Sequence, residues 1–384
     1  MADGTRISWT DATWNPVTGC TRVSAGCERC YVDWAPPFRI EGRHFTARCE
    51  ACSGTGKAES VYEMCMTCGG SGRIRSNAIG STTGVRLHGD RLDQPLRWRR
   101  PRRVFVNSLS DLFHDDVPDD FIVSVFAVMA CASQHTFQVL TKRPARMRAL
   151  LSSREFWACV AIQMGLRFAD RDDDLAVVGE ALKSISRRNC LPNVWLGVTV
   201  EDQKAADLRI PILMETPAAV RFLSCEPLLG AVDLARVGDG LVPFWCLGHG
   251  RPAGDCPNDL HLGREGGIDW VVVGGESGRG ARPMHPDWAR SLRDQCADAE
   301  VAFWFKQHGE FVEVDDPRLG DVWLLPDRHG AHGGVGTQPW KPGDVGAVAG
   351  RWSRFPDVVV RRVGKKAAGD QLDGRVCQSF PREV

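Results

Sequence analysis

Three cysteines near the start of the chain have a spacing that favours metal chemistry. Cys20, Cys27 and Cys30 lie in the segment NPVTGCTRVSAGCERCYV, with six residues in the first gap and two in the second. Three thiolates do not complete a tetrahedral zinc shell, but they can hold three irons of a [4Fe-4S] cluster and leave the fourth iron open to a substrate or cofactor. The alternative is a structural zinc site completed by a distant cysteine or histidine.

A second group of cysteines is typical of a zinc site. It consists of two C-x-x-C pairs separated by twelve residues, each followed by x-Gly-x-Gly, and its members are Cys49, Cys52, Cys65 and Cys68. A C-x-x-C turn directs two thiolates at one cation, and the glycines relieve the tight backbone around the sulfur atoms. The pattern resembles one half of a DnaJ-type cysteine-rich zinc domain. We therefore predict an inserted zinc-binding ribbon over residues 41–80.

The other eight cysteines have no short spacing between them. Free cysteine behaves as a small apolar side chain, so three of them are expected in the core, namely Cys131, Cys159 and Cys296. A glycine-rich stretch at 236–267 is predicted to be a further insertion, with four possible metal ligands, Cys246, His249, Cys256 and His261. Their spacing matches no common zinc ribbon or finger, so a metal site there stays open.

The composition restricts where and how the protein works. The 384 residues include 48 basic and 48 acidic side chains, so global attraction to a polyanion is excluded and nucleic-acid binding is left to local patches. No apolar run approaches the roughly 20 residues of a membrane span, and no signal segment is evident. The sequence predicts a cytoplasmic protein without a membrane partner. Disulfides are rare in that compartment, so clustered cysteines favour metal binding.

The elements that must position these groups alternate between strand and helix. The strand-like runs are 104–113, 136–144, 193–202, 220–230, 269–278 and 301–310, and the helical segments are 119–133, 152–188, 201–216 and 285–300. With a strand near the first cysteines, about seven strands are expected. The alternation predicts an α/β fold in which a parallel sheet forms a partial or complete (β/α) barrel from residues 1–40 and 81–311. Residues 312–384 are predicted to form a C-terminal extension.

Polar side chains end six of the predicted strands. The charged side chains and hydroxyls that we take as candidates for a site are Ser108, Ser110, Asp111, Lys142, Arg143, Glu201, Glu226 and Glu276. Because functional groups of an α/β barrel lie at the carboxyl ends of its strands, these side chains are expected to converge on one mouth.

Two basic stretches stand out against the neutral total. The first, LRWRRPRRVF, contains Arg97, Trp98, Arg99 and Arg100, and the second, TKRPARMR, contains Lys142 and Arg143. Arginines in such a stretch neutralise phosphates while an interleaved tryptophan stacks on a base, so all six residues are candidates for nucleic-acid binding. A solvated surface run is the alternative for the first stretch. Lys142 and Arg143 follow a strand and are expected to reach the mouth.

A series of motifs in order along the chain carries a family resemblance. They are ISWTDATWNPVTGC, GCERCY, VNSLSDLFHDDVP, HTFQVLTKRPARM, NVWLGVTVEDQ, RFLSCEPLLG, DWVVVGGESGRGARPMHPDWARSLRDQC and GKKAAGDQLDGR. The chain resembles the phage and bacterial three-cysteine-motif family, which occurs in mycobacteriophages and has been labelled a domain of unknown function. That family in turn resembles radical S-adenosylmethionine (SAM) enzymes, including spore photoproduct lyase.

This resemblance implies a specific cofactor chemistry. In radical SAM enzymes three cysteines hold a [4Fe-4S] cluster, SAM chelates the fourth iron, and one electron cleaves SAM to a 5′-deoxyadenosyl radical. Cys20, Cys27 and Cys30 would be the cluster ligands. The usual spacing is C-x3-C-x2-C with an aromatic residue before the third cysteine, whereas here the first gap is six residues and Arg29 takes that place.

The resemblance also implies contacts with SAM. The Gly-Gly-Glu motif that binds the SAM amino group normally ends the second strand, but here it ends a later strand at Glu276. We therefore expect the SAM amino group to be bound by a residue at the end of the second strand, and the candidates are Ser108, Ser110 and Asp111. Glu226 and Glu276 are expected to line the cofactor pocket.

These expectations favour a radical SAM enzyme that modifies or repairs a nucleic-acid base or nucleotide. It would need an external electron donor, would work in the cytosol of a phage host or bacterium, and could have a phage or host partner protein. The alternative is a non-catalytic, metal-stabilised protein that binds nucleic acid or a partner. A metal-dependent hydrolase on the same barrel is less favoured, because the strand runs before residue 300 carry no histidine at their ends.

Overall fold

A computed structural model gives the fold of the chain. It describes residues 5, 7–57, 64–168, 179, 182, 183, 185, 189–237, 267–314, 322–325, 338–339 and 358–381. The possible ligands Cys246, His249, Cys256 and His261 lie outside the described residues. Within these ranges, every helix is too short or too polar to cross a membrane.

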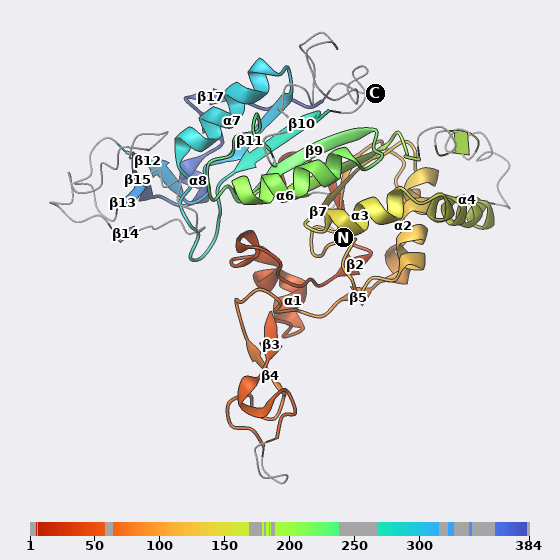
Figure 1. Cartoon of the computed structure of the whole chain (residues 1–384), viewed down its shortest axis with the longest axis horizontal. Coiled ribbons are helices and arrows are strands. Elements are labelled where there is room, and N and C mark those ends of the chain that lie inside the picture. Colours follow the sequence, from red (N-terminus) through yellow and green to blue (C-terminus); the bar gives the residue numbers. More distant parts are fainter. Residues whose placement is uncertain are drawn as a thin grey trace.

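Seven parallel strands form one curled sheet, a half-barrel (Figure 1). In spatial order they are β1 (Ala12–Trp14), β6 (Arg103–Val106), β7 (Thr136–Thr141), β8 (Val194–Thr199), β9 (Val220–Cys225), β10 (Trp270–Gly274) and β11 (Ala302–Gln307). The expected parallel α/β sheet is therefore confirmed, and of the two expected forms of barrel it is the partial one. All seven strands point the same way, so the segments that follow them meet at one edge of the sheet.

The helices between the strands cover one face of the sheet. They are α2 (Asp119–Cys131), α3 (Pro144–Leu151), α4 (Arg154–Phe168), α6 (Gln203–Met214) and α7 (Pro286–Asp298). Helix α6 begins where sequence reasoning expects it, because the Asp202 carboxylate accepts a hydrogen bond of 2.8 Å from the Ala205 amide and caps the helix. The large core lies between these helices and the sheet, and Cys296 is fully buried in it. Cys159, expected in the core, is instead exposed on α4.

The opposite face of the sheet carries a second core of aromatic side chains. Its members include Trp9, Phe105, Trp195, Phe222, Trp270 and Trp304, and Phe380 from the end of the chain packs against them. Ring centroids of Trp9 and Phe105 are 4.8 Å apart, and those of Trp304 and Phe380 are 4.7 Å apart. Aromatic packing thus fills the middle of this face, and the polar strand ends remain at its carboxyl edge.

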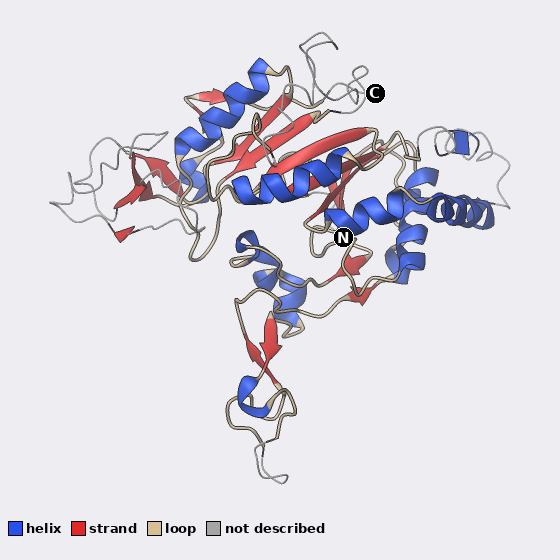
Figure 2. Ribbon diagram, viewed as in Figure 1, coloured by secondary structure: helices blue, strands red, loops and turns tan. Residues whose placement is uncertain are grey.

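The segment between β1 and β6 replaces a crossover helix with irregular structure. It contains β2 (Val17–Thr18) paired with β5 (Arg86–Leu87), helix α1 (Pro36–Ile40), and the hairpin of β3 (Thr46–Arg48) and β4 (Arg73–Arg75). We call residues 46–57 and 64–75 the arm. Figure 2 shows the arm projecting away from the sheet.

The described part of the C-terminal region adds a small antiparallel sheet. Its strands, in order, are β12 (Phe311–Glu313), β15 (Val358–Arg362), β13 (Val322–Leu325) and β14 (Gln338–Pro339). Helix α8 (Lys365–Ala368) and the pair β16 (Gln371–Leu372) and β17 (Arg375–Val376) follow. The chain then returns to β11, where the Ser379 amide donates to the Phe303 carbonyl at 3.0 Å.

Candidate metal centre and cysteine loop

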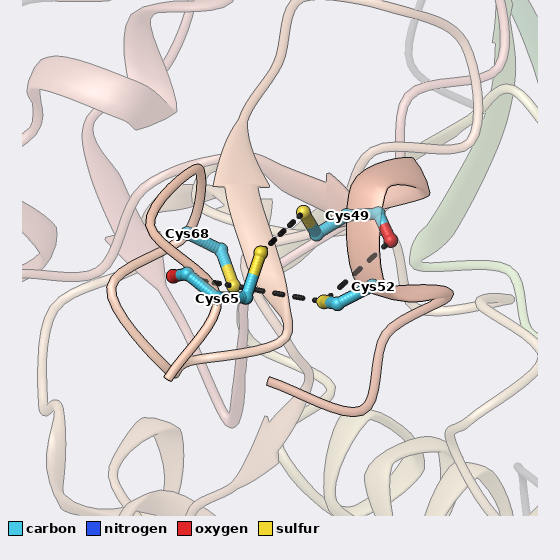
Figure 3. Close-up of side chains that lie close together, drawn as sticks. All are labelled: Cys49, Cys52, Cys65 and Cys68. Carbon is cyan, nitrogen blue, oxygen red and sulfur yellow. Dashed lines mark hydrogen bonds between the residues drawn. The ribbon is translucent and has the colours of Figure 1, made fainter. Parts of the chain in front are cut away.

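Four cysteines of the arm come together as a metal-binding group (Figure 3). The sulfur atoms of Cys49 and Cys65 are 3.9 Å apart, those of Cys52 and Cys68 are 3.7 Å apart, and all four lie within 4.8 Å of one another. Three of the four side chains are buried. Four thiolates at such separations suit a tetrahedral ion, so this group can bind a metal ion such as zinc.

The two knuckles of the arm have the same backbone arrangement. The Gly56 amide donates to the sulfur of Cys52, and the Gly72 amide donates to the sulfur of Cys68, each at 3.3 Å. Burial opposes ionisation of Cys52, but the Gly56 amide and the neighbouring thiols outweigh it and lower the pKa of Cys52 to about 6. This amide is therefore placed to stabilise a metal-binding thiolate.

The first three cysteines lie on a loop that begins at the carboxyl end of β1. A 3₁₀ turn spans Ala25–Cys27, and the Cys30 amide donates to the Cys27 carbonyl at 3.2 Å. Cys27 is buried, and Cys20 and Cys30 are half-buried. Burial, and after it the charge of Asp111, raises the pKa of Cys20 to about 12, although the Arg143 guanidinium opposes the shift. The pKa of Cys30 is raised to about 11, again by burial first. Among the described residues only the four arm cysteines form a group of possible metal ligands that all lie within 4.8 Å of one another, so the structure does not bring Cys20, Cys27 and Cys30 together in that way.

Glu201, just after β8, joins this cysteine loop to the sheet. Its carboxylate accepts a hydrogen bond of 2.5 Å from the Ser24 hydroxyl and forms ion pairs with Lys142 and, at 2.5 Å, with Arg209. Burial alone would raise the pKa of Glu201, but Lys142 and Arg209 outweigh it and lower it to about 2. A β-carbon on Gly26 would lie 2.5 Å from the carboxylate, so the loop backbone packs directly on this group.

Asp111 and Arg143 form a second connection. Asp111 accepts hydrogen bonds from the Thr141 hydroxyl at 2.7 Å and from Arg143 at 3.0 Å. Arg143 also donates to the Thr21 carbonyl at 3.2 Å, and its guanidinium lies 3.9 Å from the sulfur of Cys20. The predicted site residues Asp111, Lys142 and Arg143 therefore lie beside the cysteine loop, with their charges paired inside the protein.

Glu276 makes a third connection through Arg282. The Arg282 guanidinium binds both oxygens of Glu276, at 2.6 and 2.8 Å. The same guanidinium donates to the Ala25 carbonyl at 3.1 Å and to the Glu28 carboxylate at 3.2 Å, and both acceptors belong to the cysteine loop. Glu276 therefore fixes an arginine that holds the loop.

The remaining predicted contacts lie along the same edge. Ser108 donates to Asn15 at 3.2 Å, and Ser110 donates to the Val17 carbonyl at 2.9 Å, so both hydroxyls fasten the segment that leads into the cysteine loop. Glu226 pairs with Lys306 at 2.9 Å and accepts from the Trp9 indole at 3.3 Å. The Glu226–Lys306 pair lies at the ends of β9 and β11.

The first arginine stretch, a candidate for nucleic-acid binding, lies away from the cysteine loop. Arg97, Arg99 and Arg100 are exposed and precede β6, so they lie at its amino end, opposite the edge that carries the cysteine loop. Trp98 is half-buried, and its indole contacts His135 and the Arg102 guanidinium. The indole is therefore engaged by the core and is not a free platform for a base. Only Lys142 and Arg143 of the six proposed residues are beside the cysteines.

Sequence reasoning missed the residues that join the loop to the sheet. Ser24, Arg209 and Arg282 have no spacing that reveals their roles, because each acts on a partner brought near by the fold. Arg282 and Ala25, for example, are 257 positions apart. Glu201 carried a signal, since it ends a buried strand, but its partners could not be read from the pattern.

Taken together, these features define a parallel α/β half-barrel protein with a four-cysteine metal-binding group. The chain matches the family described as protein of unknown function (DUF5131) over residues 4–381, so it belongs to that family. No curated protein and no solved structure matches it.

Proposed function

We propose that the protein is a radical SAM enzyme whose cluster is held by the cysteine loop. The observation that carries the proposal is the position of the loop that holds Cys20, Cys27 and Cys30, which lies at the carboxyl edge of a parallel sheet, where α/β barrels place their chemistry. Three separate strand ends hold this loop in place, through Glu201, Asp111 and Glu276.

In this proposal Cys20, Cys27 and Cys30 would each give one thiolate to an iron–sulfur cluster. Burial raises the pKa of Cys20 to about 12 and that of Cys30 to about 11, so binding would have to release a proton from each thiol. A cluster with three thiolate ligands carries net negative charge, and the Arg143 guanidinium beside Cys20 complements it. Bound there, the cluster would supply the electron that cleaves SAM to a carbon radical.

Paired charges at the same edge suit the rest of SAM. The methionine part of SAM carries one amino and one carboxylate group, and the Glu226–Lys306 pair offers a group of opposite charge to each. Ser108, Ser110 and Asp111 bind within the protein, so in this proposal they position the loop and do not contact SAM. Radical chemistry suits an inert C–H bond, and we propose a nucleic-acid base or nucleotide as its substrate.

Anaerobic reconstitution with iron and sulfide tests the proposal. The wild-type protein should become brown and bind about four irons in the loop. Cys27→Ala should lose that iron and keep its zinc and its fold. Cys296→Ala is the matched control, since it removes a fully buried cysteine of the core and should leave the iron content unchanged.

One observation favours a second function. The four cysteines of the arm form a group that can hold a structural metal ion. Such an ion fits a metal-stabilised protein that binds nucleic acid or a partner and has no catalytic activity. In that case both cysteine groups hold structural metal, the wild-type protein stays colourless after reconstitution, and Cys27→Ala unfolds it.

A further inference from the structure

The arm presents three arginines that the metal site does not use. In the hairpin register Arg48 lies opposite Arg73, and Thr46 lies opposite Arg75. Because side chains alternate between the two faces of a hairpin, all three arginines share one face with Thr46. Ala47 and Ile74 take the other face, and Ile74 packs against the cysteine group. We call the first surface the arginine face.

Within the described part of the chain, the arginine face has no acidic partner. Arg48, Arg73 and Arg75 are exposed, and none of them forms an ion pair among the residues that the structure describes. Arg73 donates to the hydroxyl and the carbonyl of Thr46, each at 2.7 Å, and Arg48 donates through Nε to the Ser53 carbonyl at 2.7 Å. These bonds hold the guanidinium groups in place and leave other N–H donors available.

This arrangement works against folding of the hairpin. Like charges directly opposite each other on a two-stranded ribbon are destabilising. The described part of the arm adds a fourth basic residue, Lys57, and has one acidic residue, Glu50. The cysteine group packs with Ile74 on the other face and does not offset this repulsion. An anionic ligand would offset the repulsion between the arginines.

We infer that the arginine face binds the phosphodiester backbone of a nucleic-acid strand. Arg73 and Arg75 are two residues apart on one strand, which separates them by about 7 Å, on the order of the distance between neighbouring phosphates of an extended strand. Guanidinium groups bind phosphate oxygens in pairs. The inference rests on the proposed function for its substrate class and assigns the arm the role of holding that substrate.

The position of the arm supports this role. The arm follows Cys30 and α1 in the sequence, so its base lies beside the cysteine loop. From there it projects away from the sheet (Figures 1 and 2). A strand bound along the arginine face would therefore lie on the side of the molecule that carries the proposed active site.

Fluorescence anisotropy with a labelled 20-nucleotide strand tests the inference on the zinc-loaded protein, before any iron is added. Single-stranded DNA, duplex DNA and RNA are compared, each over a range of salt concentrations. The test variant is Arg48→Gln/Arg73→Gln/Arg75→Gln. The matched control, Arg97→Gln/Arg99→Gln/Arg100→Gln, removes the same charge from exposed arginines at the other end of the sheet.

The arm variant should bind at least one of these nucleic acids about tenfold or more weakly at 0.1 M salt. Its plot of log affinity against log salt should be shallower by roughly 2 to 3, since each lost phosphate contact removes about 0.7–0.9 from the slope. The control should bind like the wild type. Zinc content of one per chain in both variants shows that the arm is folded.

Three outcomes would overturn the inference: wild-type binding by the arm variant, equal losses in both variants, and tight binding to anionic lipid vesicles without binding to any nucleic acid. Failure of the proposed function is distinguishable from each, because it appears as an absence of iron after reconstitution. Normal iron uptake by the arm variant, together with weak binding, separates the arm from the cysteine loop.

Discussion

At the scale of single residues, buried charges control how the cysteine loop is held. Glu201 is closed to solvent and has two cationic partners, and a carboxylate in such a place is stabilised only by those partners. Arg282 and Arg143 act in the same way for Glu276 and Asp111. Each pair also contacts the loop, through Ser24, Thr21 and Ala25, so the loop is attached to three strand ends.

Glu201→Gln tests this dependence. The substitution leaves Lys142 and Arg209 without their carboxylate, and we expect the free energy of unfolding at pH 7 to fall by about 3–5 kcal/mol. Denaturation by urea measures the change. Glu155→Gln, on the exposed side of α4, is the control and should change it by less than about 0.5 kcal/mol.

The same carboxylate predicts a pH dependence. The pKa of Glu201 is about 2 in the folded protein, below its ordinary value of 4.5, so its contribution is complete above pH 4.5 and is lost as the pH falls towards 2. At about 1.4 kcal/mol per pH unit, this contribution is about 3 kcal/mol. The stability difference between wild type and Glu201→Gln should therefore shrink over this range. A constant difference between pH 6 and pH 3 would contradict the assignment.

At the scale of elements, strand polarity explains which of the predicted residues lie beside the cysteine loop. Buried runs such as 193–202 and 220–230 predict β8 and β9 because apolar β-branched and aromatic residues mark strands that are covered on both faces. Whether a polar stretch belongs to the site depends on which end of a strand it adjoins. Lys142 follows β7 and lies at the site, whereas Arg97 precedes β6 and lies at the other edge.

The knuckles of the arm depend on glycine at one position each. Gly72 has a φ of +70°, and a β-carbon there would collide with the Gly54 carbonyl oxygen. We expect Gly72→Ala to weaken zinc binding by tenfold or more, measured by competition with a chelator. Gly69 also has a positive φ, +56°, but nothing lies within 4 Å of its would-be β-carbon. Gly69→Ala should therefore have a much smaller effect, and equal effects would refute this account of the knuckle.

At the scale of the whole molecule, the half-barrel brings residues from distant parts of the chain to one edge. The alternation of strands and helices was enough to predict the parallel sheet, and with it that the polar strand ends meet at one edge. The degree of closure was not predictable, and neither was the packing of Trp9 and Phe380, from opposite ends of the chain, in one aromatic cluster on the sheet. The ion pairs that hold the cysteine loop were not predictable either, since they join residues with no local pattern.

The central claim is that the open corner of a cluster on Cys20, Cys27 and Cys30 binds SAM. Electron paramagnetic resonance of the anaerobically reconstituted, reduced protein, recorded with and without SAM, tests it most directly. We predict a [4Fe-4S] signal that changes on addition of SAM and that is absent in Cys27→Ala. A protein that holds only zinc, or a cluster signal that SAM leaves unchanged, would contradict the claim.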